Sequence, residues 1–284
     1  AQHGFLVTRQ ASYGPLGSYR FPNFKLDNYV VYTNNPPGVA YRGFGNTQIH
    51  FALESHIDEL AHAIGMDTYE IRRKNVLVEG EINAAGEIQH SVAGSELLDE
   101  IKGGLERHGP LERGEDGPWR RGRGIAFANK DSVAPSASSA IVKVHNDETV
   151  EVRHSAGNIG QGSSTTLIQI AAEFFKVRPD RVKTAEVDTW VTPYDQLTGS
   201  SRITFAAGNA VLMACQDVKN QILTMAAEVM QATPEELDLA DMRVFVKSNP
   251  DRFMAVRELF RTVFFTGSFL PKGGELLGKA TFTV

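Results

Sequence analysis

The feature that most constrains the fold is the segment 202–231, which is expected to form one long helix. The small residues Ala206, Ala207, Gly208 and Ala210 imply that this helix packs closely against a neighbour. Cys215 follows in an apolar stretch, where a small buried hydrophobic side chain is expected. The chain must therefore supply other elements that cover such a helix.

The segments around this helix alternate between strand and helix patterns. Residues 140–144 and 149–154 alternate apolar and polar side chains around Asn146 and Asp147, which predicts a β-hairpin. The pattern predicts an α+β protein with mixed sheets and packed helices in two lobes. The other expected elements are helices over 165–175 and 255–265 and strands over 182–187, 243–247 and 279–284.

The first part of the chain has a different composition. Residues 1–45 hold many Gly, Pro, Asn and Tyr residues in short apolar alternations such as 28–32, which predicts strands joined by tight turns. Helical spacing follows over 47–64, and Asp67 is expected to begin a second helix over 67–78. The Gly-rich and charged stretch 79–124 is the expected boundary between lobes 1–115 and 116–284.

Composition excludes several classes of protein. The net charge of −5, without a long run of Lys or Arg, argues against a nucleic-acid partner. The single cysteine excludes internal disulfides and cannot hold an iron–sulfur cluster. No signal peptide or membrane span is expected, so we expect a cytoplasmic protein. His50, His56 and His62 lie six residues apart on one helix, share no face, and are expected to serve packing or surface roles.

Three segments, 40–45, 157–165 and 192–202, place Gly, amide and hydroxyl groups where a plain connection needs only a turn. The second and third lead into helices, whose N-terminal N–H groups could bind an anion or a polar cofactor. Ordinary helix caps and turns are the alternative. In the first segment, Arg42 and Phe44 could contact a ligand, or Phe44 could simply enter the core.

Six motifs in a fixed order carry a resemblance to a known family. They lie at 19–23, 32–37, 40–45, 65–75, 160–165 and 198–208. Together they resemble the molybdopterin-binding subunit of the xanthine dehydrogenase and aldehyde oxidase family of molybdenum hydroxylases. Carbon monoxide dehydrogenases of that superfamily carry Cys-Ser-Phe where this chain has Gly43, Phe44 and Gly45, so the resemblance favours a hydroxylase.

The resemblance implies an oxidoreductase that hydroxylates an aromatic heterocycle or aldehyde with oxygen from water. Arg42 and Gln161 would lie at the oxo ligands of the molybdenum, which the pterin dithiolene would hold without a direct protein ligand. Phe44 would stack on a flat substrate ring, and Lys130 and Asp131 would contact its polar groups. Besides Arg42 and Gln161, the expected cofactor-binding residues are Ala40, Gly43, Ile159, Gly160, Gly162, Thr198, Gly199, Ser200, Ser201, Arg202 and Thr204.

Two loops of the family have no counterpart in this sequence. A Gly-Gly-Phe-Gly loop would precede residue 1, and the loop with the general-base glutamate would follow Val284. We therefore expect an internal fragment or one subunit of a split enzyme, inactive alone. Its cofactor would be molybdopterin or the cytosine dinucleotide form, with iron–sulfur and FAD groups on other chains or segments. A non-catalytic cofactor-binding or assembly module and, more distantly, a phosphate-ligand enzyme without molybdenum are the alternatives.

Overall fold

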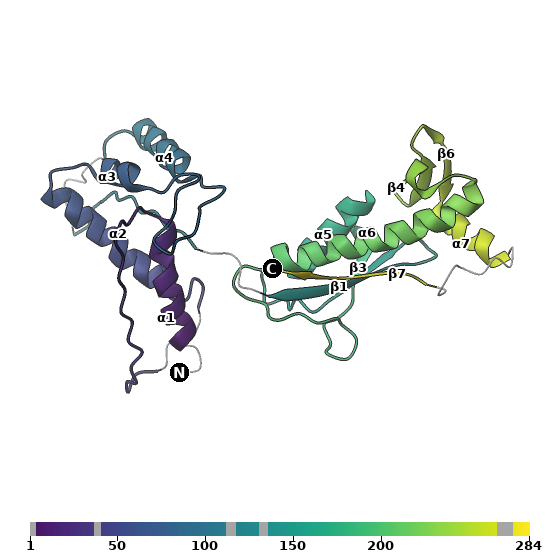
Figure 1. Cartoon of the computed structure of the whole chain (residues 1–284), viewed down its shortest axis with the longest axis horizontal. Helices are drawn as coiled ribbons and strands as arrows, with labels where there is room; N and C mark the ends of the chain where they lie inside the picture. Colours follow the sequence, from purple (N-terminus) through teal and green to yellow (C-terminus); the bar gives the residue numbers. More distant parts are fainter. Residues whose placement is uncertain (1–3, 37–40, 112–117, 131–135, 266–274) are drawn as a thin grey trace. The chain divides into compact units, whose positions relative to one another are not determined.

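The computed structural model describes residues 4–36, 41–111, 118–130, 136–265 and 275–284 (Figure 1). Contacts divide the chain into two compact units, unit 1 with residues Ala1–Asp131 and unit 2 with residues Ser132–Val284. The boundary expected after residue 115 lies outside the described residues. None of the described helices combines the length and the apolar character that crossing a bilayer requires.

Unit 2 is built on a four-stranded sheet in the order β3-β2-β1-β7. The central strand β1 (Ala137–Val144) pairs antiparallel with β2 (Val150–His154) and with β7 (Leu276–Thr283). The short strand β3 (Val182–Thr184) runs parallel to β2. The predicted hairpin and the predicted mixed sheet are confirmed, and β3 ends earlier than the predicted strand over 182–187.

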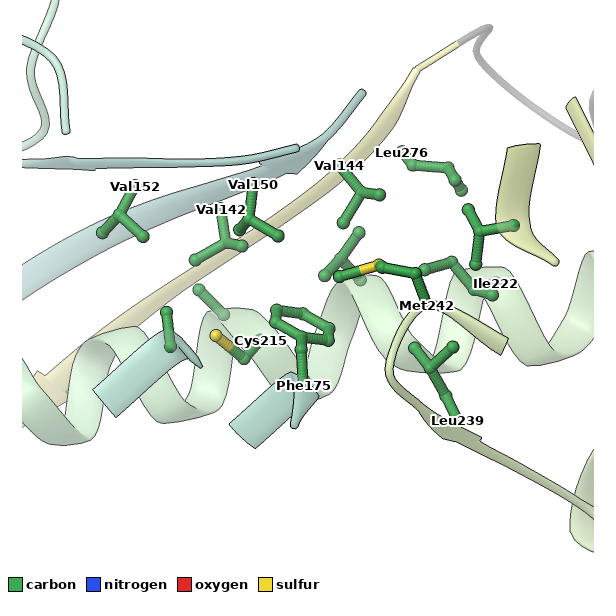
Figure 2. Close-up of a cluster of buried hydrophobic side chains, with 14 of the residues drawn as sticks. Val142, Val144, Val150, Val152, Phe175, Cys215, Ile222, Leu239, Met242 and Leu276 are labelled. Carbon is green, nitrogen blue, oxygen red and sulfur yellow. The ribbon is translucent and has the colours of Figure 1, made fainter. Parts of the chain in front are cut away.

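Two helices, α5 (Ser163–Phe175) and α6 (Ile203–Met230), cover one face of this sheet (Figure 1). Every second residue of β1 and β2 is buried, and Figure 2 shows the buried valines of these strands with Phe175 and Cys215 in one cluster. The predicted long helix and the buried position of Cys215 are confirmed. Alternating strands under an apolar helix face produce this two-layer core.

Small residues bring α6 close to its neighbours, as the sequence predicts. A Cβ atom at Gly278 of β7 would lie 2.1 Å from the carbonyl oxygen of Ala214 in α6. At Gly208, a Cβ atom would lie 3.0 Å from a methyl group of Ile170 in α5. A side chain at Gly278 would therefore push β7 away from the helix.

A second, three-stranded antiparallel sheet joins β4 (Leu237–Ala240), β5 (Arg243–Val246) and β6 (Asn249–Ala255). The helix α7 (Val256–Phe265) follows, as predicted. Of the three strands, the sequence predicts only β5. The strand β6 includes Pro250, a residue typical of turns and edge strands, so pairing with β5 rather than local preference determines its conformation.

Unit 1 is helical, and its described residues form isolated bridges, such as Tyr19 with Val76, rather than a sheet. Asp67 caps α3 (Thr68–Asn75), because its carboxylate accepts the backbone N–H groups of Tyr69 (2.8 Å) and Glu70 (3.2 Å). The predicted pair of helices is confirmed, although the second ends earlier. The helices of unit 1 are α1 (Gly4–Tyr13), α2 (Asn46–Ala63), α3 (Thr68–Asn75) and α4 (Gly94–His108).

The prediction of strands over residues 1–45 is wrong. The helix α1 lies there, and residues 21–36 have no strand partner among the described residues. Tyr29 and Tyr32 are 84% and 95% exposed. Apolar alternation indicates an extended chain, but a strand also needs a partner for its N–H and C=O groups. The helix α1 lies close to Gly45, where a Cβ atom would be 2.0 Å from the Val7 carbonyl oxygen.

The stretch 79–124, expected to be the boundary between the lobes, contains the helix α4. Leu98 of this helix is fully buried and packs with Tyr69 and Val76. Leu98, Ile101 and Leu105 have helical spacing, which was the available signal. The neighbouring glycines and charges obscured it.

Candidate functional site

The two Gly- and hydroxyl-rich loops of unit 2 contact each other. Residues 155–162 follow β2 and lead into α5, and residues 192–202 lead into α6. The hydroxyl groups of Ser155 and Thr192 lie 2.8 Å apart, and the Ser155 hydroxyl also donates to the Pro193 carbonyl. A Cβ atom at Gly157 would lie 3.5 Å from the Thr198 hydroxyl oxygen. We call these segments the loop pair.

The start of β1 anchors the second loop beside the first. The backbone N–H of Ser139 donates to the carbonyl of Tyr194 at 2.9 Å, and the N–H of Gln196 donates to the carbonyl of Ala137 at 3.3 Å. The segment 194–196 thus bonds to β1 at Ala137 and Ser139, which precede the part of β1 that pairs with β2. These bonds hold the second loop, which leads into α6, against the start of β1.

In the first loop, polar side chains bond to the loop's own backbone. The Gln161 amide accepts the N–H of Ile159 at 2.7 Å and donates to the carbonyl of Gly157 at 3.1 Å. Gly160 and Gly162 have left-handed backbones, with φ of 98° and 82°. Gln161 and Ile159 are exposed, so the predicted cofactor residues of this loop lie at the surface of unit 2.

In the second loop, hydroxyl groups remain available. Ser200 and Ser201 adopt left-handed backbones, with φ of 53° and 55°. Within the described part of the chain, the side chains of Ser200, Ser201 and Thr204 accept or donate no hydrogen bond. Arg202 differs from its neighbours, because its side chain is fully buried. The structure thus brings Gln161 and the predicted serines into one loop pair and buries Arg202 beneath it.

His154 was not identified from the sequence. It ends β2, is 1% exposed, and neither ring nitrogen has a hydrogen-bond partner among the described residues. Burial lowers the pKa of His154, and the negative charge of Asp195 opposes this shift. A buried imidazole, whose charged form burial disfavours, therefore lies next to the loop pair. The only sequence feature that indicates its burial is its position in a strand with alternating apolar residues.

In unit 1, two predicted substrate residues meet. The amino group of Lys130 lies 5.8 Å from the centre of the Phe44 ring, a cation–π distance. Phe44 is half-buried, and Arg42 beside it is exposed. Ala40 and Asp131, also predicted site residues, lie outside the described residues. Phe44 and Lys130 form one group within unit 1, and the loop pair forms another within unit 2.

A buried polar ring supports the segment that carries Lys130. The Asn46 amide donates to the carbonyl of Asn129 at 2.8 Å, and the Asn129 N–H donates to His50 Nε2 at 3.2 Å. His50 Nδ1 lies 2.8 Å from the Asn46 carbonyl, which makes it the donor. The packing role expected for His50 is confirmed, and the role of Asn46 was missed.

Two family models with the description "Molybdopterin cofactor-binding domain" match the chain, one over residues 102–284 and one over residues 1–76. The first match alone covers more than half of the chain. The chain therefore belongs to the molybdopterin cofactor-binding domain family, and the resemblance seen in the motifs is confirmed.

The chain is similar to parts of longer proteins. It is 29% identical over 276 residues to the xanthine dehydrogenase molybdenum-binding subunit of Escherichia coli O157:H7, which aligns 93% of this chain with 36% of that protein. It is 28% identical over 227 residues to the aldehyde oxidoreductase of Megalodesulfovibrio gigas, covering 77% of this chain and 25% of that protein. The chain thus spans little more than a third of these relatives, or less.

A solved structure shows the same fold. The chain matches quinoline 2-oxidoreductase from Pseudomonas putida 86 with a TM-score of 0.77 and 22% identity, over 98% of this chain and 37% of that chain. The predicted α+β architecture of a molybdopterin-binding protein is confirmed by this likeness.

Proposed function

We propose that this chain binds molybdopterin with molybdenum as part of an oxidoreductase that hydroxylates an aromatic heterocycle or aldehyde, with oxygen from water. One observation carries the proposal: two loops, each at a helix N-terminus, contact each other within the matched cofactor-binding domain. Similarity to parts of longer oxidoreductases supports the reaction class.

The chemistry of the loop pair fits a polar cofactor with a phosphate group. The first turns of α5 and α6 leave backbone N–H groups unpaired at the positive ends of the helix dipoles. The free hydroxyl groups of the second loop add donors beside them. Anions bind at helix N-termini through such groups. We assign to the cofactor Ile159, Gly160, Gln161, Gly162, Thr198, Gly199, Ser200, Ser201 and Thr204.

The cofactor, when bound, would supply the redox centre at which the substrate is oxidised. We assign Arg42 and Gln161 to the surroundings of the metal and Ala40 and Gly43 to the cofactor. The exposed Gln161 amide is free to exchange its bonds within the loop for bonds to a ligand. The described residues include no group of His, Cys, Asp or Glu arranged to hold a metal ion, which is compatible with a metal held by the pterin.

Phe44 and Lys130 are the proposed substrate contacts. The half-buried ring of Phe44 can stack on a flat substrate. The amino group of Lys130 beside it can pair with a negative charge on that substrate. This combination favours a polar heterocycle or a carboxylated ring. Asp131, outside the described residues, stays a predicted contact.

Electrons would leave through iron–sulfur and FAD groups on other chains or segments, because the single cysteine of this chain cannot hold a cluster. That cysteine, Cys215, is buried, and burial raises its pKa to about 12. The proposed cofactor is molybdopterin, as such or as the cytosine dinucleotide. The proposed location is the cytoplasm, since the chain depends on no disulfide.

The test compares Gln161→Ala with Gln216→Ala, which removes the same side chain from the exposed face of α6. The complete enzyme that contains this chain is purified, and molybdenum, pterin fluorescence and substrate-dependent dye reduction are measured. Gln161→Ala should lower turnover at least about tenfold, whereas Gln216→Ala should not. A wild-type enzyme without molybdenum and pterin would contradict the proposal. Pterin without turnover would indicate the non-catalytic module instead.

A further inference from the structure

We propose that Arg202 and Asp195 are positioning residues, which hold the second loop of the loop pair in a fixed shape for the cofactor without touching it. The inference rests on the proposed function of the loop pair. The two side chains are 0% and 2% exposed, and their ion pair measures 2.5 Å. Neither side chain is therefore at the surface where a cofactor would bind.

The Arg202 guanidinium has no donor left for a ligand. An arginine side chain carries five N–H donors, and here each is used within the unit. Two of the bonds go to residues of the same loop, and three go to the start of β1. The acceptors are Asp195 Oδ1 (2.5 Å), the Leu197 carbonyl (2.6 Å), Ser136 Oγ (2.9 Å), the Ala137 carbonyl (3.0 Å) and Ser138 Oγ (2.5 Å).

Asp195, at the other end of the segment, accepts two further hydrogen bonds. Its Oδ2 accepts the hydroxyl of Ser138 at 2.7 Å, and its Oδ1 accepts the N–H of Leu197 at 3.1 Å. Asp195 and Arg202, the two ends of the segment 195–202, thus form an ion pair with each other and hydrogen bonds to β1. The residues between them form a closed loop.

That loop contains two strained residues. Ser200 and Ser201 both have left-handed backbones, a conformation that residues other than glycine rarely adopt. Such conformations persist where the surrounding structure enforces them, and they cluster at binding sites. The buried ion pair enforces this conformation in a loop that carries the unpaired hydroxyls of Ser200 and Ser201 and whose Thr198 lies next to Gly157 of the first loop.

A purely stabilising role would make a different prediction. Unit 1 contains a second buried pair, Arg72 with Glu54 at 2.8 Å, which ties α3 to α2 instead of closing a loop with left-handed serines. If the buried ion pairs only stabilise the fold, Arg202→Lys and Arg72→Lys should change the cofactor content of the enzyme equally. If Arg202 positions the loop, only Arg202→Lys should affect it. Arg72→Lys is therefore the matched control.

The test measures pterin fluorescence and molybdenum per chain in the complete enzyme, with thermal unfolding as a check that each variant folds. Arg202→Lys should lower cofactor content about tenfold, and Arg72→Lys should leave it unchanged. Adding Ser201→Gly to Arg202→Lys should restore part of the loss, because glycine adopts the left-handed backbone without the ion pair. The rescue stays partial, since the change also removes one hydroxyl assigned to the cofactor. Ser91→Gly, at an exposed left-handed serine of unit 1, should restore nothing.

Full cofactor content in Arg202→Lys would overturn the inference, and so would equal rescue by Ser91→Gly and Ser201→Gly. If Arg202→Lys fails to fold, Asp195→Asn takes its place in the same series, since it keeps the shape and removes the charge. A wild-type enzyme without pterin would overturn the proposed function. A loaded wild type with an equally loaded Arg202→Lys would overturn this inference alone.

Discussion

The two units use different interactions to hold their elements together. Unit 2 buries a large continuous apolar cluster between its four-stranded sheet and the helices α5 and α6. In unit 1 the apolar cluster is small, and charged groups are buried beside it: Arg72 pairs with Glu54, which also accepts the hydroxyl of Tyr19 at 2.8 Å. Burial, and then the charge of Glu54, raises the pKa of that hydroxyl.

This difference predicts opposite responses to mutation. An apolar core loses stability when a buried side chain is truncated, and the loss grows with the volume of the cavity that remains. A buried polar network loses most when one partner is removed and the other stays charged, and least when both are replaced. The following predictions test this contrast, from the largest expected effect to the smallest.

Phe175→Ala should destabilise unit 2 by about 3–5 kcal/mol, as truncations of buried aromatic side chains do. Phe175 is fully buried and meets Phe174 edge to face at 5.0 Å. The measurement is urea unfolding followed by circular dichroism. Phe253→Ala, which removes a ring that is 52% exposed, is the control and should cost much less. Equal losses from the two variants would contradict an apolar core centred on Phe175.

Arg72→Met should destabilise unit 1 by about 3 kcal/mol, because it leaves the Glu54 carboxylate buried without its cation. The double variant Arg72→Met/Glu54→Leu should recover most of that loss, since neither charge remains. The same urea experiment measures both variants. A double variant at least as unstable as the single one would show that unit 1 depends on the network itself.

Phe44→Ala should cost unit 1 only about 1–2 kcal/mol, because the ring is half-buried and loses a cation–π contact with Lys130. In the complete enzyme, the same change should weaken binding of a planar substrate by about 1–3 kcal/mol. Phe51→Ala on α2, where the ring is 78% exposed, is the control for both measurements. A loss of stability above about 3 kcal/mol would make Phe44 a core residue and remove it from the site.

His154 should make the stability of unit 2 depend on pH. Burial lowers the pKa of His154 in the folded state below its ordinary value of 6.5. As the pH falls from about 6.5 towards the lowered pKa, His154 becomes protonated in the unfolded chain but not in the folded chain. The free energy of unfolding therefore decreases. His154→Gln should reduce this dependence, measured as the urea midpoint against pH. Identical profiles for wild type and variant would contradict a buried, neutral His154.

The sequence predicts unit 2 better than unit 1 for the same physical reason. The hairpin, α5, α6 and α7 follow from apolar periodicity, because their buried faces pack into one cluster. Residues 28–32 have an equally clear alternation, yet they form no strand in the described structure, since periodicity says nothing about a pairing partner. The helix α1 contacts Gly45, far along the chain, and no local pattern indicates this contact.

The candidate site shows the same limit. Glycine and hydroxyl residues ahead of two helices identify both loops, but their contact through Ser155 and Thr192 joins residues that are distant in sequence. The sequence also cannot separate Arg202 from its neighbours, although its side chain is buried and those of Ser201 and Thr204 are exposed. That distinction arises from the contacts of Arg202 with the start of β1 and with Asp195 and Leu197 of its own loop.

The loop pair of unit 2, in this account, binds the cofactor. Hydrogen–deuterium exchange tests it most directly, on the complete enzyme from a host that makes molybdenum cofactor and from one that does not. The account predicts that the cofactor slows exchange in residues 157–162 and 198–204 together, while exchange in β4 to β6 stays the same. An enzyme that contains pterin but shows no added protection in either loop would contradict the account.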